Sequence, residues 1–309
     1  MAVKEIAYED REMWLKIREQ YIGGSDAGCV VGMNPYRSAY TLWAEKTGKI
    51  PAFEGNLTTE VGAYLEEFVA SVFERETGKK VRRKNRVLIN DDYPFACANV
   101  DRMVVGEKAL LEIKTTNSFP IMKQLRGTEF PEAYYCQCIH YLAVTGLERA
   151  YLAVLVNCRE FKMFVLERDE DEIAALMTAE REFWRNVVNN TPPAADGSDS
   201  TADTLVALYP DSTEGRCDLF AYENDLRNYM DIKAQIKSLE ELQGEISNRI
   251  KSVMADAGRG ESNGFKVSFA SQERKTFDTK KLAAEHPEIN LEDYYKKSTI
   301  RPFKVTEVA

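Results

Sequence analysis

The chain of 309 residues carries 41 lysines and arginines against 50 aspartates and glutamates, so its formal net charge at pH 7 is −9. That length suits one large domain or two modest ones, because a single core stops growing near about 250–300 residues. The longest uncharged apolar run, residues 150–156, has seven residues, too few for the ~20 that span a bilayer. Since the N-terminus also lacks a signal pattern, we expect a cytoplasmic protein with no membrane partner.

A glycine-rich segment precedes a predicted short helix near the N-terminus. Gly23, Gly24 and Ser25 are followed by residues 26–31, DAGCVV, which places Ser25 at a candidate N-cap. The free N–H groups of a helix N-terminus also suit a phosphate. The residues alone leave two interpretations open, in which Ser25 either only caps the helix or also faces a phosphate.

Periodicity predicts an amphipathic helix over residues 59–77, ended by Gly78. Glu66 lies at the flank of its apolar stripe, one turn after Gly62, and a flank position can reach the edge of a buried site. Glu66 is therefore a candidate ligand, with ordinary solvent exposure as the alternative. The stripe itself consists of Val61, Leu65, Phe68, Val69, Val72 and Phe73.

A cluster of positive charge follows this helix. Positions 79–86 hold six lysines and arginines and no acid. An acidic net charge taken alone argues against a nucleic-acid partner, but screening confines each patch to a range of about 10 Å. The cluster is therefore either a solvated connection or a surface that contacts phosphate.

Residues 95–116 predict a β-hairpin, because two strand-like runs flank a turn at residues 106–108. In the second strand the two-residue period places Glu112 and Lys114 on one face. The hairpin would bring Asp101, an isolated acid in an apolar run, to the level of Glu112.

Two carboxylates this close would repel each other, and one would hold a proton unless a cation lay between them. A divalent ion removes that conflict, and Lys114 can then position or deprotonate a water or stabilise negative charge. With only two histidines, His140 and His286, oxygen ligands favour Mg²⁺ or Mn²⁺ over zinc. The alternative is a surface strand that carries an ordinary Glu–Lys pair.

The six cysteines are too sparse for a disulfide scaffold in a chain of this length, so we expect buried, reduced thiols.

The last third of the chain changes character. Residues 191–215 carry five acids, three prolines and no base, which predicts an exposed linker. Residues 226–254 predict a helix with a coiled-coil-like seam, and strand-like pieces follow at 265–269 and 299–305. We therefore expect a domain over 1–190, an acidic linker over 191–215 and a helical extension over 216–309. The seam would pack on its own domain or on a sister subunit, and its positions are Tyr229, Ile232, Ile236, Leu239, Gln243, Ile246, Ile250 and Val253.

Glu66, Asp101 and the run Glu112-Ile113-Lys114 resemble the (P)D-(D/E)xK nuclease signature, with Val100 at a position known to vary. The surrounding sequence resembles the YqaJ-like viral recombinases, relatives of the lambda-type exonuclease, over about residues 10–185. The segments that carry this resemblance are WLKIR at 14–18, IGGSDA at 22–27, GMNPY at 32–36 and YYCQCIHY at 134–141.

The resemblance implies an α/β (α+β) fold of the restriction-endonuclease type, with a mixed central sheet flanked by helices. Asp101 and Glu112 would bind Mg²⁺ together with the Ile113 carbonyl, and Mn²⁺ would substitute. Glu66 would help to hold one of up to two ions, and Lys114 would act on the attacking water.

The resemblance also implies roles outside the metal site. Gln137 would orient the catalytic groups from the helix that carries Tyr134 one turn earlier, and Tyr134, Arg18 and Ser25 would contact DNA at its 5′-phosphate.

The activity implied is a Mg²⁺-dependent exonuclease that degrades the 5′ strand of duplex DNA and leaves a 3′ tail for a single-strand annealing protein. Such proteins are phage or prophage encoded and act in the bacterial cytoplasm, and the family suggests a trimer. Two alternatives stay open: an endonuclease of the same superfamily, and a non-catalytic module that binds DNA ends with structural carboxylates.

Overall fold

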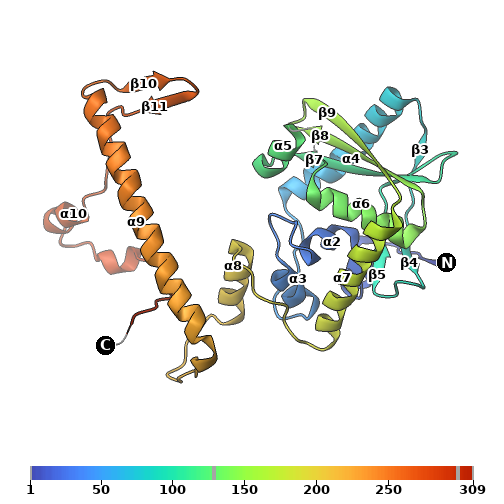
Figure 1. Ribbon diagram of the computed structural model, residues 1–309, viewed down its shortest axis with the longest axis horizontal. Helices are drawn as coiled ribbons and strands as arrows, with labels where there is room; N and C mark the ends of the chain where they lie inside the picture. Colours follow the sequence, from blue (N-terminus) through green and yellow to red (C-terminus); the bar gives the residue numbers. More distant parts are fainter. Residues whose placement is uncertain (1, 127–129, 297–299, 308–309) are drawn as a thin grey trace. The chain divides into compact units, whose positions relative to one another are not determined.

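The computed structural model describes residues 2–126, 130–296 and 300–307. The chain forms two compact units, unit 1 over Met1–Tyr209 and unit 2 over Pro210–Ala309 (Figure 1). Within the described residues, no helix is both long enough and apolar enough to span a bilayer.

Unit 1 is built on a five-stranded mixed sheet. Strand β7 pairs antiparallel with β6 and parallel with β8, and the β7–β8 crossover contains α5, Phe119–Arg126, and α6, Glu132–Thr145. Parallel strands need a long crossover connection, which is usually helical. The strands in spatial order are β3 Val81–Arg82, β6 Arg102–Val104, β7 Ala109–Thr116, β8 Arg149–Val156 and β9 Glu160–Glu167.

Helices cover both faces of this sheet, as expected for a strand such as β7, whose first five residues are all buried. Val69 and Phe73 of α4, Leu57–Thr77, pack on one face with Leu111 of β7. Helix α6 packs on the other face, beside the strands in Figure 1, and residues 136–144 of this helix are all buried. The predicted mixed sheet flanked by helices is confirmed.

The remaining elements of unit 1 surround α6 and the sheet. A second, four-stranded sheet has the order β1-β4-β5-β2, in which β2 runs parallel to β5. The elements are β1 Val3–Ile6, α1 Arg11–Glu19, β2 Ile22–Gly23, α2 Gly24–Val30, α3 Ala39–Lys46, β4 Val87–Asn90, β5 Ala96–Ala98, α7 Glu170–Val188 and α8 Asp199–Leu208.

Helix α4 agrees with its prediction at one end only. It ends at Thr77, and Gly78 adopts the left-handed conformation (φ 71°) that favours glycine. It begins two residues earlier than predicted, and its apolar stripe is shorter, because Val61 and Phe68 are exposed. Only the C-terminal half of the helix buries side chains against the sheet.

Residues 191–215 are not an exposed linker throughout, because they contain α8. Ser198 caps this helix, and its Thr201 and Thr204 are buried. Thr201 Oγ1 donates to Ser38 Oγ (2.8 Å), and Thr41 Oγ1 donates to the Ser200 carbonyl (3.0 Å). Small hydroxyl side chains thus bury α8 against α3, and the first compact unit ends near residue 209 rather than 190.

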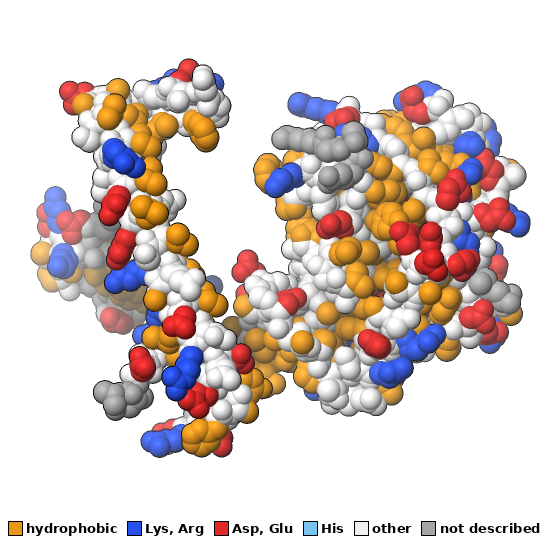
Figure 2. All heavy atoms as spheres, in the orientation of Figure 1, with side chains coloured by type: hydrophobic (Ala, Val, Ile, Leu, Met, Phe, Trp, Pro, Cys, Tyr) orange, Lys and Arg blue, Asp and Glu red, His pale blue; other side chains and the backbone are white. Residues whose placement is uncertain are grey.

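Unit 2 is dominated by one long helix, α9, Glu223–Met254, none of whose 32 residues is buried. Its seam is exposed, from 40% at Tyr229 to 85% at Val253, and Figure 2 shows hydrophobic side chains along this helix. The predicted strand at 265–269 is confirmed as β11, but residues 300–305 form no strand and residue 299 lies outside the described residues. The other elements are η1 Phe220–Tyr222, β10 Arg259–Ser262, β11 Phe265–Ser268, α10 Thr279–Glu285 and η2 Leu291–Tyr294.

The cysteines are all free, and four of them, at positions 29, 97, 136 and 138, are buried as expected. Cys158 and Cys217 are exposed, so the expectation of burial is wrong for these two. Cys158 lies in the turn between β8 and β9 with φ 54°, where the chain reverses at the surface.

Candidate active site

The predicted hairpin brings Asp101 and Glu112 together. Arg102 pairs with Leu111 across β6 and β7, which sets Asp101 at the level of Glu112. The Ile113 N–H donates to Asp101 Oδ2 (2.8 Å) and fixes that carboxyl at the strand end. A residue period of two on β7 then directs Glu112 and Lys114 to the same side, as predicted.

Glu112 is the most enclosed group of this site, at 1% exposure. Its Oε1 accepts a hydrogen bond from Gln137 Nε2 (2.7 Å) and pairs with Lys114 Nζ (2.6 Å). Its Oε2 is buried without a hydrogen-bond partner in the described part of the chain. A buried carboxylate oxygen in that state is unfavourable unless a ligand completes it.

The electrostatics of the pair are unbalanced. Burial, followed by the charge of Glu112, raises the pKa of Asp101 well above its usual value. Burial also raises the pKa of Glu112, and the charge of Glu66 pushes both values in the same direction. Burial disfavours the Lys114 ammonium, but Glu112 and Asp101 outweigh burial and raise its pKa. One cationic group therefore faces two carboxyl groups.

The oxygen donors fit a hard divalent cation. Asp101 and Glu112 supply carboxylate oxygens, the orphaned Glu112 Oε2 lacks a partner, and bound positive charge would lower both raised pKa values. His140 is not available to a metal, because its ring nitrogens contact Glu180 Oε1 (2.8 Å) and the Cys97 carbonyl (2.9 Å).

Glu66 lies at the edge of the site but is held by an arginine. Arg102, 3% exposed, pairs with Glu66 and with Glu67 (2.9 Å), and its Nη1 donates to the Asp101 carbonyl (2.7 Å). Across the described ranges, no group of three or more acidic, histidine or cysteine side chains is placed to hold a metal. The structure thus brings Asp101, Glu112 and Lys114 together, while Glu66 lies close enough for its charge to act on both carboxyls but is paired with Arg102.

Sequence reasoning missed Arg102. The available signal was its place directly after Asp101 in an apolar strand, where a charged residue needs a buried partner.

Tyr134 and Gln137 both reach the site from α6, in agreement with their predicted places. The Tyr134 ring lies 5.6 Å from Lys114 Nζ, within range of a cation–π contact. Gln137 Nε2 also donates to the Tyr141 hydroxyl oxygen (2.9 Å). Tyr141 in turn packs against Gly24, since a Cβ added at Gly24 would lie 2.4 Å from its ring.

Arg18 and Ser25, predicted to meet a phosphate, contact each other. Arg18 Nη2 donates to Ser25 Oγ (2.7 Å), and the guanidinium stacks 4.6 Å from the Trp14 ring centre. Ser25 is not the N-cap: α2 begins at Gly24, and Gly23 is the cap residue. Ser25 is exposed beside the half-buried Arg18, so both polar groups reach the surface.

The basic cluster at 79–86 is less positive than its sequence suggests. Four of its six bases pair with acids from other segments, so they offer little net charge to phosphate. The pairs are Lys79–Glu107, Lys80–Glu74, Arg83–Glu67 and Lys84–Glu5.

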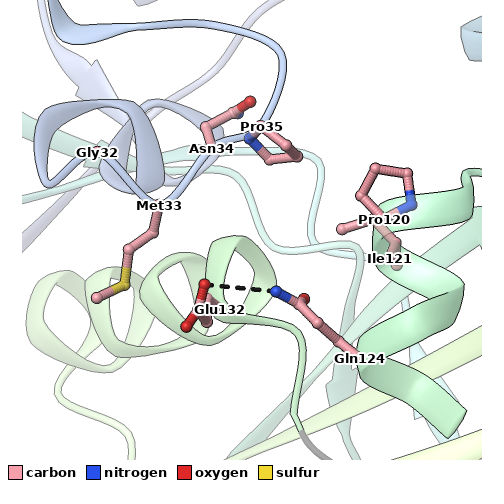
Figure 3. Close-up of a pocket in the computed structure, with 8 residues that line it drawn as sticks. All are labelled: Gly32, Met33, Asn34, Pro35, Pro120, Ile121, Gln124 and Glu132. Carbon is pink, nitrogen blue, oxygen red and sulfur yellow. Dashed lines mark hydrogen bonds between the residues drawn. The ribbon is translucent and has the colours of Figure 1, made fainter. Parts of the chain in front are cut away.

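A separate cavity of about 190 Å³ opens between the loop after α2 and helices α5 and α6 (Figure 3). Gln124 Nε2 donates to Glu132 Oε2 (3.4 Å) across its wall. None of the carboxylate-site residues lines it. Its walls are Gly32, Met33, Asn34, Pro35, Pro120, Ile121, Gln124 and Glu132.

Comparison with known proteins identifies the family. The YqaJ-like viral recombinase domain matches residues 13–148. The uncharacterized protein YqaJ of Bacillus subtilis (strain 168) is 38% identical over 305 residues, which cover 97% of this chain and 95% of that protein. The chain belongs to the YqaJ-like viral recombinase family.

Solved structures support the same fold for this family member. An alkaline exonuclease (LHK-Exo) from Laribacter hongkongensis is 21% identical, with a TM-score of 0.50, over 58% of this chain and 94% of that one. The same enzyme in complex with dAMP is 20% identical, with a TM-score of 0.51 and the same coverage. The chain therefore shares the fold of this alkaline exonuclease over 58% of its length.

Proposed function

We propose that this protein is a Mg²⁺-dependent nuclease that digests the 5′ strand from the ends of duplex DNA. One observation carries the proposal: buried Glu112 keeps an oxygen without a partner next to Asp101, while Lys114 and Gln137 hold its other oxygen. A carboxylate pair with this deficit of positive charge suits Mg²⁺, or Mn²⁺ in its place. Family membership and the shared fold support the same activity.

The side chains have separable tasks in this proposal. Asp101 and Glu112 would hold one ion with the Ile113 carbonyl, and Glu66 would reach a second. Bound Mg²⁺ would supply Lewis acidity for phosphodiester hydrolysis. The raised pKa of Lys114 keeps it an ammonium in the metal-free site, which favours orienting the water and stabilising charge over removing a proton. Gln137 fixes Glu112, and Arg18, Ser25 and Tyr134 would contact the DNA strand.

Linear duplex DNA with 5′-phosphate ends tests the activity. With Mg²⁺, the wild type should digest it, whereas Asp101→Ala and Lys114→Ala should be at least about 10²-fold slower. Lys108→Ala is the matched control, because Lys108 lies in the same hairpin and pairs only with Glu148 at the surface. Equal digestion by all variants, or none by the wild type, contradicts the proposal.

Closed circular plasmid distinguishes the two nuclease alternatives. An enzyme that needs an end leaves the plasmid intact, whereas an endonuclease nicks it. Binding of the linear duplex without turnover in Mg²⁺ or Mn²⁺ would instead indicate a DNA-end-binding module.

The biological setting is part of the proposal. The 3′ tail would pass to a single-strand annealing protein during phage-type recombination in the bacterial cytoplasm, and the family suggests a trimer. The mass of the full chain in solution tests the oligomer: three times the mass of one chain supports a trimer, and the mass of one chain contradicts it.

A further inference from the structure

A second buried carboxylate, Asp26 of α2, lies outside the Asp101–Glu112 site and is fully paired. It is 2% exposed. One oxygen pairs with Arg37, and the other accepts the Gly23 N–H (3.1 Å) and pairs with Lys46 Nζ (3.1 Å). Burial opposes ionisation, but Lys46, Arg37 and Arg18 hold the pKa of Asp26 far below its usual range. Asp26 is therefore a stable negative charge.

Lys46, the last residue of α3, uses all three N–H groups of its ammonium in contacts with this region. Its side chain is 10% exposed. Besides the pair with Asp26, its Nζ donates to the carbonyls of Arg18 (2.9 Å) and Tyr21 (2.7 Å). An ammonium has three protons, so these three contacts leave none for another ligand. Lys46 thus ties the end of α1 to the start of α2.

Lys46 and Asp26 hold the chain next to the two members of the Arg18–Ser25 pair. Lys46 holds the backbone of Arg18, while Asp26 is the chain neighbour of Ser25. The guanidinium is flanked by the Trp14 ring and by Gly23, where an added Cβ would lie 3.2 Å from Arg18 Nη2. Arg18 and Ser25 thus reach the surface, while Lys46 and Asp26, which hold the chain at these positions, lie beneath them.

We propose that Lys46 and Asp26 are positioning residues for a 5′-phosphate site whose contacts are made by Arg18 and Ser25. This inference rests on the proposed action at DNA ends. An arginine side chain loses conformational entropy when it binds a ligand. Because the backbone of Arg18 is already held and its guanidinium is already stacked, the entropy lost on binding is smaller. The Asp26–Lys46 pair therefore sets the preference for a phosphorylated end without touching it.

The test measures binding, so that it does not depend on cleavage. The full-length protein is titrated with duplexes that differ only in a 5′-phosphate or a 5′-hydroxyl, with Ca²⁺ in place of Mg²⁺. The wild type should prefer the phosphorylated end by about tenfold. Arg18→Ala and Lys46→Met should each reduce that preference to about twofold or less, chiefly by weakening the phosphorylated complex.

A double variant separates positioning from general destabilisation. If Lys46 acts through Arg18, Arg18→Ala with Lys46→Met should show no further loss of preference. Lys16→Met, an exposed lysine of α1 paired with Glu12, is the matched control and should keep the wild-type ratio. If Lys46→Met does not melt cooperatively, Lys46→Gln takes its place, because it keeps donors for both carbonyls and removes the charge beside Asp26.

Three results would overturn the inference: an unchanged ratio in the Lys46 variant, equal losses on both duplexes, or no preference in the wild type. Digestion in Mg²⁺ is measured in parallel. A wild type that prefers the phosphorylated end but digests nothing contradicts the proposed nuclease and leaves the positioning role intact.

Discussion

Unit 1 contains two carboxylate sites, at Asp26 and at the Asp101–Glu112 pair, whose charges are balanced in opposite ways. Asp26 meets Arg37, Lys46 and a backbone N–H, and its pKa is held low. Asp101 and Glu112 share Lys114, leave one oxygen without a partner, and have raised pKa values. Asp26 and Glu112 are about equally buried, at 2% and 1% exposure, so the supply of positive charge makes the difference between them.

This contrast separates a carboxylate whose charge the protein itself compensates from a pair whose charge it compensates only in part. A buried charge persists when its partners compensate the loss of water, as at Asp26. A pair that is under-compensated in the protein gains most from an added ion, as at Asp101 and Glu112. The predictions below test that distinction, beginning with the largest effect.

Removing the charge of Glu112 should abolish digestion. We expect Glu112→Gln to reduce the rate on linear duplex by about 10³-fold, because both the ion and Lys114 lose their common partner. Single-turnover digestion in saturating Mg²⁺ measures it, with Glu148→Gln as a control on an exposed glutamate. A rate within tenfold of wild type would show that Glu112 is not needed for the chemistry.

Neutralising one carboxylate in each cluster should change stability in opposite directions. Asp26→Asn removes the buried carboxylate that Arg37 and Lys46 share and should lower the free energy of unfolding by about 3–5 kcal/mol. Asp101→Asn relieves repulsion and should raise the Tm of the metal-free protein by about 2–4 °C. Thermal melts in a chelator compare the two, and shifts of the same sign would contradict the contrast.

Arg102 should matter for metal affinity more than for folding of the hairpin. Arg102→Met removes the buried partner of Glu66 and Glu67. Because Glu66 would then no longer be fixed at the edge of the site, we expect the Mg²⁺ concentration for half-maximal digestion to rise about 10–100-fold. Arg83→Met removes only the exposed arm on Glu67 and serves as the control. The same Mg²⁺ requirement in both variants would exclude a role for Arg102 in placing Glu66.

The smallest effect is on pH dependence. Because the pKa of Asp101 is raised, protons compete with Mg²⁺ below that value, and affinity should fall by up to about tenfold per pH unit. The pKa of Asp26 is lowered instead. The stabilisation that its ionised form gives to the fold is therefore complete above the usual aspartate pKa of about 3.9 and is lost only as the pH falls below that value. The rise in Tm on adding Mg²⁺ should therefore shrink as the pH falls through the raised pKa of Asp101, and a rise that does not change with pH would contradict this.

Local patterns made the placement of the candidate site residues on β7 predictable. The two-residue period of β7 and the short turn place Asp101, Glu112 and Lys114 together through contacts within one hairpin. The end of α4 at Gly78 follows from the same kind of local rule. Gln137 lies 25 residues from Glu112, and only the family resemblance pointed to it.

Other features depend on contacts that no local pattern encodes. Lys46 reaches a carbonyl 28 residues away, and Arg102 binds acids more than 30 residues earlier. Helix α8 was hidden because its two fully buried residues are threonines, which by composition resemble a linker, and its leucines Leu205 and Leu208 are only partly buried. Hydroxyl groups that satisfy one another across two helices carry no hydrophobic signal in the sequence.

Because Gly24 has no side chain, helix α6 can pack closely against the start of α2, and a substitution at Gly24 would affect residues of α6. A methyl group there would displace the Tyr141 ring, whose hydroxyl accepts from Gln137, the residue that holds Glu112. A substitution at Gly24, the first residue of α2, would thus weaken the hydrogen bond that holds Glu112, although no residue of the carboxylate site is replaced. The start of α2 and helix α6 are coupled through the contact between Gly24 and Tyr141, so a larger residue at position 24 would require a smaller one at position 141.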